Sequence, residues 1–556
     1  VSKLHRHIFS FVAHESRRAR TMWDEKRVGI VREVSSSSVT VVVDPEITTL
    51  SKKIGAKIYH IGQIGTYVLI PVGQLLVLGI VAEFKKGDVY EGDKMTQRYL
   101  MDVTLIGSLK KGKFESGVSV LPTVDMVVYL LEDKDLRAAF STYQKFNFSV
   151  GQLSLFESER AYLDPNKFFG KHLAVLGSSG AGKSCTVSSL LQKVVTLPDT
   201  NIVILDIHNE YKSAFPDGCQ HFDIAALELP YWLMNFDEMV ELFVDSRDEN
   251  ATAIISTLQD QVYVGKKAKN QRLASMITVD TPVFFDINEV RAKFQFLDTE
   301  RISGGTGGSR EGPHNGKFTR FLMRLNSMLN DPRYTFMFKP RVCTDSESAK
   351  GLLTMIFGLD GKSKVTIMDM SGIPFDVVNT IVALVSRIAF DFNFWNPNRR
   401  DLPILLVLEE AHNYLSVNSR GSTAARLTVE RIAKEGRKYG VSVMIVSQRP
   451  SEISETILSQ CNNFVILRLL NPVDQAYIRR LVPETFSGLE AVISTLRQGE
   501  AIIVGDSAPM PLRIQIDAPN PPPASADIYF YDKWKQKAIS TNADDVMERW
   551  WNQHKT

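Results

Sequence analysis

Short apolar runs rich in β-branched residues alternate with turn-forming residues from about Arg27 to Val150. The breaks include Ser35–Ser38, Lys85–Asp88 and Lys110–Lys113, and no helical periodicity comes between the runs. Many short strands without intervening helices are typical of a small barrel or sandwich. The predicted strands are Val28–Val34, Val39–Val43, Tyr67–Val72, Leu75–Phe84, Tyr99–Ile106 and Gly117–Leu121.

One uncharged stretch in this region, Ile61–Ala82, is long enough to raise the question of a membrane span. It contains Pro71 and several glycines, and many of its apolar residues are β-branched. Two buried strands joined near Gly73 and Gln74 explain this composition better than a spanning helix. We therefore expect no membrane association.

From Gly151 onward, apolar runs that look like buried parallel strands alternate with helical patterns such as Phe375–Phe390 and Leu427–Tyr439. This alternation is typical of an α/β fold whose sheet is covered on both faces. The predicted strands are Leu173–Leu176, Ile202–Leu205, Val365–Met368, Ile404–Leu408, Val441–Val446, Phe464–Leu467 and Ala501–Val504.

The domain organisation follows from these patterns. A helix-rich insertion at about 225–341 interrupts the α/β region; it includes Phe236–Phe243, Phe318–Leu329 and a glycine-rich loop at 304–309. The chain divides into a basic arm at 1–26, a β-barrel at 27–150, an α/β core at 151–518 and a proline-led tail at 519–556. The last part of the tail is expected to be helical.

Composition narrows the class of protein. With 44% hydrophobic and 23% charged residues and a net charge of +2, the chain is an ordinary globular protein of 556 residues without a global charge signal for nucleic acid. Its four cysteines are scattered without CxxC spacing, which argues against a disulfide framework or a zinc site. A reducing cytoplasm is the expected location.

A glycine-rich octet, Gly177–Ser184, lies between an apolar strand and the helical stretch Cys185–Val195. This GxxxxGK[ST] pattern in a strand-loop-helix setting is typical of a P-loop that binds a nucleoside triphosphate. Backbone N–H groups and the helix N-terminus face the phosphates, Lys183 reaches the β- and γ-phosphates, and Ser184 helps to hold Mg²⁺. The predicted nucleotide-binding residues are Gly177, Ser179, Gly180, Ala181, Gly182, Lys183, Ser184 and Cys185.

Paired carboxylates, Glu409 and Glu410, follow the apolar strand Ile404–Leu408. Glu409 would position Mg²⁺, mostly through water, and Glu410 would polarise the attacking water. A solvated turn is the alternative for such a pair. The preceding strand and the P-loop upstream favour the catalytic interpretation.

Two further polar residues have competing interpretations. Gln448 follows the strand Val441–Val446, where it could sense the γ-phosphate or cap the turn before Pro450; we favour the sensor. Arg437 belongs to a basic run with Arg431, Lys434 and Lys438. That run is either a solvated stripe on a helix or the source of an arginine finger for a neighbouring subunit, and the residues alone leave both open.

Five motifs in order resemble the HerA family of the HerA/FtsK group, which are hexameric DNA-translocating ATPases. The motifs are Gly177–Ser184, Leu205–Tyr211, Leu229–Leu233, Glu409–Asn413 and Glu435–Gly440. The resemblance extends over most of the chain. The β-rich N-terminal region resembles the family's HAS barrel, and the α/β region resembles a RecA-like core. Cys185 departs from the Thr or Asn often found there, and a thiol at that position could be sensitive to oxidation.

The resemblance implies roles for individual residues. Lys183 and Ser184 contact phosphate and Mg²⁺, and Glu409 is the metal-site acid. Asp206 supports the metal-water network. Glu410 is the catalytic base, Arg437 acts in trans, and Gln448 is the sensor.

The expected function is that of a ring-forming, ATP-driven translocase or helicase on double-stranded DNA, with ATP and Mg²⁺ bound between the subunits of a homo-hexamer. Ser416–Arg426 could line the pore through Arg420 and Arg426, or be an ordinary surface loop. Relatives work with a NurA-like nuclease in end resection, or with sirtuin-like or nuclease effectors in anti-phage defence. The alternative is a hexameric scaffold that binds nucleotide and regulates an effector without translocation.

Overall fold

The computed structural model describes residues 23–110, 113–224, 227–303, 309–373, 375–417, 423–482, 489–526, 528–535 and 542–552. Most of the basic arm and the Gly304–Gly308 part of the glycine-rich loop lie outside these ranges. The chain forms two compact units. The first contains residues up to Ser189 together with Gln448–Ser451 and Asn462–Ala518, and the second contains Leu190–Ser447, Glu452–Cys461 and the residues from Pro519 onward.

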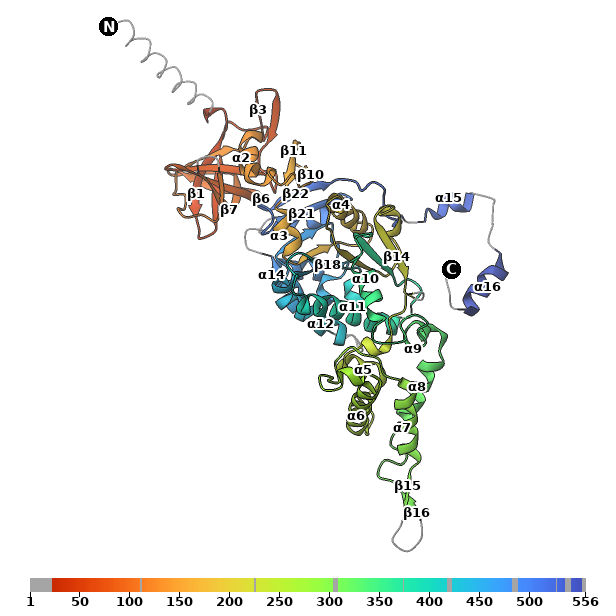
Figure 1. Ribbon diagram of the computed structural model, residues 1–556. Helices are drawn as coiled ribbons and strands as arrows, with labels where there is room; N and C mark the ends of the chain where they lie inside the picture. Colours follow the sequence, from red (N-terminus) through yellow and green to blue (C-terminus); the bar gives the residue numbers. More distant parts are fainter. Residues whose placement is uncertain are drawn as a thin grey trace, which may run out of the picture. The chain divides into compact units, whose positions relative to one another are not determined.

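The first unit begins with a closed β-barrel (Figure 1). Its strands follow the order β2-β1-β9-β5-β6-β7-β8, and a second pairing of β2 with β7 closes the sheet on itself. The barrel strands are β1 (Arg27–Val34), β2 (Ser38–Val43), β5 (Tyr67–Val72), β6 (Leu75–Glu91), β7 (Lys94–Lys110), β8 (Lys113–Ser116) and β9 (Val127–Leu130). A two-stranded hairpin, β3 (Ser51–Ile54) and β4 (Lys57–His60), is separate from this sheet.

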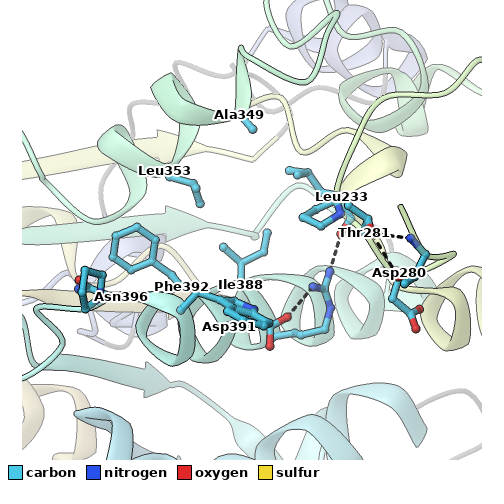
Figure 2. A pocket seen from close by; sticks show the side chains of 14 residues that line it. Leu233, Asp280, Thr281, Ala349, Leu353, Ile388, Asp391, Phe392 and Asn396 are labelled. Atoms are coloured by element: carbon cyan, nitrogen blue, oxygen red, sulfur yellow. Dashed lines mark hydrogen bonds and ion pairs between the residues drawn. The ribbon is translucent and has the colours of Figure 1, made fainter. Parts of the chain in front are cut away.

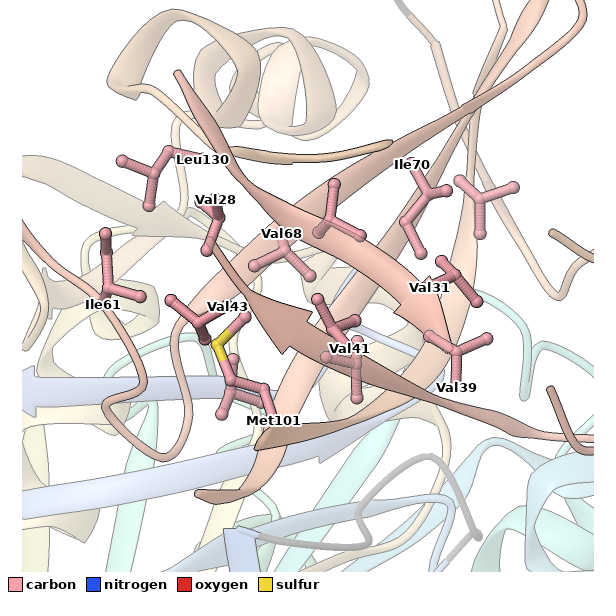
Figure 3. Packing of buried hydrophobic residues seen from close by; sticks show 14 of the residues in the cluster. Val28, Val31, Val39, Val41, Val43, Ile61, Val68, Ile70, Met101 and Leu130 are labelled. Carbon is pink, nitrogen blue, oxygen red and sulfur yellow. The ribbon is translucent and has the colours of Figure 1, made fainter. Parts of the chain in front are cut away.

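Small branched side chains fill the barrel. Figure 3 shows Val28, Val41, Val68 and Met101 from four different strands pointing toward one another. Because side chains alternate between the two faces of a strand, β2, β5, β7 and β9 send every second residue of a short stretch into this core. The spacing is wider in β1 and β6, whose pairings contain register shifts. The apolar runs read from the sequence correspond to β1, β2 and β5 and to parts of β6 and β7.

Two details of the barrel differ from the prediction. The expected break at Lys85–Asp88 is wrong, since β6 continues to Glu91 and pairs with β7 along that stretch. The expected strand at Gly117–Leu121 is also wrong, because the strand ends at Ser116 and Gly117 has a φ of +85°. The uncharged stretch at 61–82 does contain two strands, β5 and β6, joined at Gly73 and Gln74 as predicted.

The rest of the first unit is mixed α/β. Its strand order is β11-β10-β22-β21-β20-β12. Only β12 and β20 pair in parallel within this run; β21 runs antiparallel to β20, so the expectation that Ala501–Val504 is a parallel strand is wrong. The elements are α2 (Asp133–Gln144), β10 (Ser149–Leu153), β11 (Phe156–Tyr162), α3 (Pro165–Gly170), β12 (Leu173–Leu176), β20 (Asn463–Ile466), α14 (Pro472–Leu481), β21 (Glu500–Gly505) and β22 (Leu512–Ile516).

The second unit contains a fully parallel run of strands in the order β19-β18-β13-β17-β14. In four of these five strands, β13, β17, β18 and β19, all residues are buried. This burial explains why they appear in the sequence as largely continuous apolar runs. The strands are β13 (Ile202–Asp206), β14 (Cys219–Asp223), β17 (Val365–Asp369), β18 (Ile404–Leu408) and β19 (Val441–Ser447). The edge strand β14, with its polar Gln220 and His221, was not predicted.

Helices make up most of the remainder of this unit (Figure 1). The predicted helix at 236–243 is confirmed as α5, and the one at 318–329 as α8. The helices are α5 (Phe236–Phe243), α6 (Ala251–Lys269), α7 (Ile287–Thr299), α8 (Thr319–Asn330), α9 (Thr335–Phe338), α10 (Ala349–Ile356), α11 (Phe375–Trp395), α12 (Thr423–Glu435) and α13 (Glu455–Ser459). A small hairpin, β15 (Arg301–Ser303) and β16 (Ser309–Glu311), follows α7.

Helix α4 (Lys183–Val195) starts in the first unit and ends in the second, as predicted after the P-loop. The tail forms α15 (Phe530–Lys535) and α16 (Ala543–Asn552), so its last part is helical. Together these elements confirm the predicted fold class, an α/β core with a helical insertion after a small β-barrel.

Among the described residues, one helix is long and apolar enough to cross a membrane by length and composition alone. This segment is Val377–Trp395 of α11, and 78% of the window that meets the criterion is buried inside the protein. Burial against neighbouring elements accounts for its apolar surface.

Candidate active site

The first unit holds the phosphate-binding loop between β12 and α4. Ser178 anchors the loop to the chain after β20: its N–H donates to the Arg468 carbonyl at 2.8 Å, and its Oγ accepts from the Leu470 N–H at 3.0 Å. The Gly499 N–H, in the turn before β21, donates to the Ala181 carbonyl at 3.1 Å. The loop is therefore held from both sides by its own unit.

Glycine is required in this loop by conformation and by space. Gly180 and Gly182 have φ values of +70° and +99°, a region that residues with a Cβ seldom adopt. A Cβ on Gly177 would lie only 2.9 Å from Leu467 Cβ. Helix α4 then begins at Lys183, so the positive end of its dipole lies at the loop. This geometry suits an anionic ligand such as a triphosphate.

Gln448 also belongs to the first unit, directly after β19, and its side chain is half-buried. In the turn that follows, the N–H and Oγ of Ser451 donate to Asp474 Oδ1 at 3.1 and 2.6 Å. Asp474 therefore caps this turn, a structural task that the sequence left open for Gln448.

The second unit brings Asp206 and Glu409 together at the ends of two neighbouring parallel strands, β13 and β18. Asp206 is fully buried and Glu409 is 3% exposed. Burial raises the pKa of Glu409 well above its ordinary value, and the charge of Asp206 raises it further. Glu409 Oε2 accepts a hydrogen bond of 3.1 Å from the Ile207 N–H. Two buried carboxylates side by side form a site that a cation would stabilise.

The carboxylate of Asp206 organises the backbone that follows it. Its Oδ1 accepts from the N–H groups of His208 and Glu210 at 3.2 Å each, and its Oδ2 accepts from the Tyr211 N–H at 3.0 Å. The motif at 205–211 thus encodes a turn with an acidic cap, which the sequence did not reveal. The role of Asp206 in a metal-water network stays a prediction.

The side chains at this position suit a magnesium ion that keeps most of its water ligands better than a metal that is coordinated entirely by protein groups. In the described ranges, no group of three or more His, Cys, Asp or Glu side chains could hold a metal. The hydroxyl of the buried Tyr211 finds no hydrogen-bond partner among the described residues, and its pKa is raised by burial and then by the charges of Glu409 and Asp206. The carboxylates of Asp206 and Glu409 offer oxygen ligands, which suit Mg²⁺, an ion that usually keeps several of its own waters.

Glu410 lies next to Glu409 but turns away toward a different strand. It has the left-handed backbone conformation, with φ +45° and ψ +46°, which costs about 1–2 kcal/mol for a residue with a side chain. Its Oε2 lies 3.3 Å from His412 Nδ1, and His412 Nδ1 lies 3.3 Å from Ser447 Oγ at the end of β19. The Tyr414 hydroxyl donates to the Glu409 carbonyl at 2.7 Å and holds the backbone in this turn.

Arg437 does not lie on the helix predicted for it. Helix α12 ends at Glu435, and Arg437 lies in the 3-10 turn Gly436–Tyr439 that follows. The turn packs closely at its start, since a Cβ on Gly436 would lie 2.5 Å from the Val441 carbonyl oxygen. The Arg437 side chain is exposed, whereas Arg431 packs over the Phe390 ring at 4.5 Å. The predicted basic stripe is therefore interrupted.

Part of the predicted pore segment, residues 418–422, lies outside the described residues. Arg420 lies outside the described residues, and Arg426 lies in the first turn of α12, where it pairs with Glu430 at 3.0 Å. Glu241 of α5 caps the same turn by accepting from the N–H groups of Thr423 and Ala424 at 3.2 and 2.7 Å. The charge of Arg426 is therefore paired with a carboxylate of the same unit, that of Glu430.

A cavity of about 740 Å³ lies elsewhere in the second unit. Figure 2 shows Leu353, Ile388 and Phe392 lining it. At its edge, the buried Arg387 makes a bidentate pair with Glu238 at 2.8 and 3.1 Å. None of the site residues predicted from the sequence lines this cavity.

The start of the proline-rich tail packs against the turn that Asp206 organises. The Ala524 N–H donates to the Glu210 carbonyl at 2.8 Å, and Ser213 Oγ donates to the Pro522 carbonyl at 2.8 Å. Gln192 of α4 donates to the Pro521 carbonyl at 2.8 Å. No sequence signal connected these segments, since an extended proline run shows no periodicity.

Comparison with known proteins supports the same class of protein. Residues 148–389 match the family model "Helicase HerA, central domain". A probable helicase of Methanocaldococcus jannaschii is 24% identical over 516 residues, covering 87% of this chain and 93% of that protein. The DNA double-strand break repair helicase HerA of Saccharolobus solfataricus is 25% identical over 502 residues, covering 85% and 91%. Among solved structures, VirB4 of Thermoanaerobacter pseudethanolicus is 16% identical with a TM-score of 0.49, over 67% of this chain and 96% of that one.

Proposed function

Because the chain belongs to the HerA family, we propose that it is an ATP-hydrolysing DNA translocase or helicase. The observation that carries the proposal is the buried acidic pair at the end of β18, in a chain that also forms a P-loop. A nucleotide-binding loop needs only glycines and a lysine, but hydrolysis also needs an acid at the metal and a base for water. Several relatives are named DNA double-strand break repair helicases.

We propose that the loop and the acids act on one nucleotide, as the order of motifs in the family implies. Lys183 contacts the phosphates, and Ser184 and Glu409 hold Mg²⁺, Glu409 mostly through water. Bound Mg²⁺ would neutralise charge on the phosphates and on the buried acids. Glu410 accepts a hydrogen bond from the attacking water and polarises that water for attack on the γ-phosphate. Gln448 senses the γ-phosphate or its water.

We further propose a homo-hexamer in which Arg437 of one subunit enters the nucleotide site of the next. The exposed position of Arg437 on a short turn supports this role, since a finger must reach beyond its own subunit. Double-stranded DNA would pass through the central pore, contacted by the segment at 416–426. The barrel is the proposed docking module for an effector, either a NurA-like nuclease in repair or a sirtuin-like or nuclease effector in anti-phage defence.

The rate of ATP hydrolysis with and without duplex DNA tests the proposal. We expect DNA to stimulate the wild-type rate, and we expect Glu410→Gln to abolish hydrolysis while ATP binding and the oligomer are retained. General-base catalysis contributes about 10²- to 10⁴-fold, so the loss should be of that order.

The second candidate function is a nucleotide-binding ring that organises an effector without translocation. The complete set of acids argues against pure scaffolding but does not couple hydrolysis to motion. If wild-type hydrolysis ignores DNA and no strand displacement occurs, the motor proposal fails and the scaffold is favoured. Co-purification with the product of a neighbouring gene would then identify the effector.

A further inference from the structure

His412 places one ring nitrogen between the proposed catalytic base and a neighbouring strand. Its side chain is 11% exposed, and its Nδ1 lies 3.3 Å from Glu410 Oε2. The same Nδ1 lies 3.3 Å from Oγ of Ser447, the last residue of β19. In sequence, Ser447 directly precedes Gln448. All three contacting side chains belong to the second unit.

The backbone explains why Glu410 meets this histidine. The left-handed conformation of Glu410 bends the chain directly after β18 and starts the 3-10 turn Ala411–Asn413. As a result, the carboxylate of Glu409 lies toward the end of β13, at Ile207, while that of Glu410 lies toward the end of β19. A left-handed residue with a side chain is strained, and such strain persists where the surroundings over-determine it.

We propose that His412 is a positioning residue for ATP hydrolysis: its Nδ1, held against Ser447, orients the Glu410 carboxylate toward the attacking water. This inference rests on the proposed ATPase function and deepens it. The hydrogen bond of Nδ1 is with Ser447 Oγ, and its 3.3 Å approach to Glu410 Oε2 is an electrostatic contact and not a second hydrogen bond. An ionised carboxylate has no hydrogen to donate, so the contact stabilises Glu410 when Nδ1 carries the hydrogen and its partial positive charge faces the carboxylate. The contact with Ser447 restricts rotation of the imidazole and ties the base to the end of β19.

The arrangement has a consequence for control of the reaction. The end of β19 continues into the proposed γ-phosphate sensor, Gln448. If the end of β19 moved, Ser447 would shift His412, and His412 would shift the Glu410 carboxylate. Gln448 and Glu410 would not need to touch. His412 thus links the state of the sensor to the orientation of the base.

Steady-state hydrolysis by the full-length protein, at saturating duplex DNA, tests the inference. We expect His412→Ala to lower kcat about tenfold. Loss of a residue that orients a site residue typically costs about 10- to 100-fold, and we expect the lower end of that range. The KM for ATP should stay within about twofold, because His412 orients the base and does not bind the nucleotide. Thermal unfolding and the oligomeric state, measured in parallel, identify a variant that has simply lost its fold.

A matched pair of variants separates positioning from packing. In His412→Asn, the amide nitrogen takes the place of Nδ1, whereas in His412→Gln it takes the place of Nε2. We expect His412→Asn to exceed His412→Gln in kcat by roughly fivefold, the factor that corresponds to a polar contact of about 1 kcal/mol. Ser447→Ala should lower kcat in the same direction as His412→Ala.

Two results would overturn the inference while leaving the ATPase proposal intact. One is a wild-type kcat for a folded His412→Ala. The other is equal impairment of the Asn and Gln variants, which would mean that the imidazole acts only through its volume. Absence of hydrolysis by the wild-type protein would instead refute the proposed function itself, and this inference with it.

Discussion

Replacement of Gly182 by alanine tests whether the P-loop conformation described above is the one that binds ATP. Gly182 has a φ of +99°, and a Cβ built on it would lie 3.4 Å from the Gly499 nitrogen. Gly180, two residues earlier, has a φ of +70°, and a Cβ there would meet nothing within 4 Å. The two glycines therefore form a matched pair that differs mainly in how far φ lies from the usual left-handed value.

The magnitudes follow from the backbone. Alanine at Gly180 would adopt the left-handed helical region, which costs about 1 kcal/mol. Alanine at Gly182 would need a φ of +99°, well beyond the centre of that region at about +57°. This backbone strain costs about 2–3 kcal/mol, while the Cβ itself would make only ordinary contact with the Gly499 backbone. If each variant relaxes to another loop conformation and must return to bind, the apparent Kd rises by the corresponding factor. At 1.4 kcal/mol per tenfold, we expect ATP to bind roughly fivefold weaker to Gly180→Ala and about 30- to 150-fold weaker to Gly182→Ala.

Equilibrium titration of the full-length variants with a fluorescent ATP analogue measures both Kd values. Thermal unfolding without nucleotide serves as the control, because strain confined to an exposed loop should leave the melting temperature nearly unchanged. Equal Kd values for the two variants, or weaker binding to Gly180→Ala, would refute the reasoning from loop strain.

Two further predictions concern the second unit. Arg387→Ala leaves the buried Glu238 without its bidentate partner, and denaturant unfolding should show a loss of about 3–5 kcal/mol; a double change to Met at 387 and Leu at 238 should lose much less. For Glu409, the pKa is raised in the folded state, so the unfolded state binds fewer protons and the nucleotide-free protein should lose stability as the pH rises above 4.5, the ordinary value for glutamate. Melting temperatures against pH should show a smaller fall for Glu409→Gln, and an equal fall would contradict the raised pKa.

The local elements of this protein were predictable because their signals are local. The P-loop, the strand before each predicted acid and helices such as α5 and α11 each depend on a few consecutive residues. A continuous apolar run reports that a strand is buried on both faces, but not which strand it pairs with or in which direction. That is why β21 was placed correctly along the chain but with the wrong direction.

The geometry of the candidate site depended on contacts between distant residues. The sequence shows two adjacent glutamates, but only the left-handed backbone at Glu410 separates their side chains toward different strands. It shows a histidine two residues later, but not that its ring nitrogen reaches Ser447, 35 residues along the chain. It shows Asp206 as an acid, but not that three backbone N–H groups already occupy its oxygens.

The chemistry available to this protein can be read along the chain: a phosphate loop, paired acids, a basic run and the α/β class that carries them. How the barrel closes, where α12 ends and which side chain contacts Glu410 become clear only in the folded structure. The difference lies in how far apart in sequence the interacting residues are. Backbone conformation and burial are set by neighbouring residues and their periodicity, whereas strand pairing and the orientation of a buried side chain are set by residues that folding alone brings within a few ångströms.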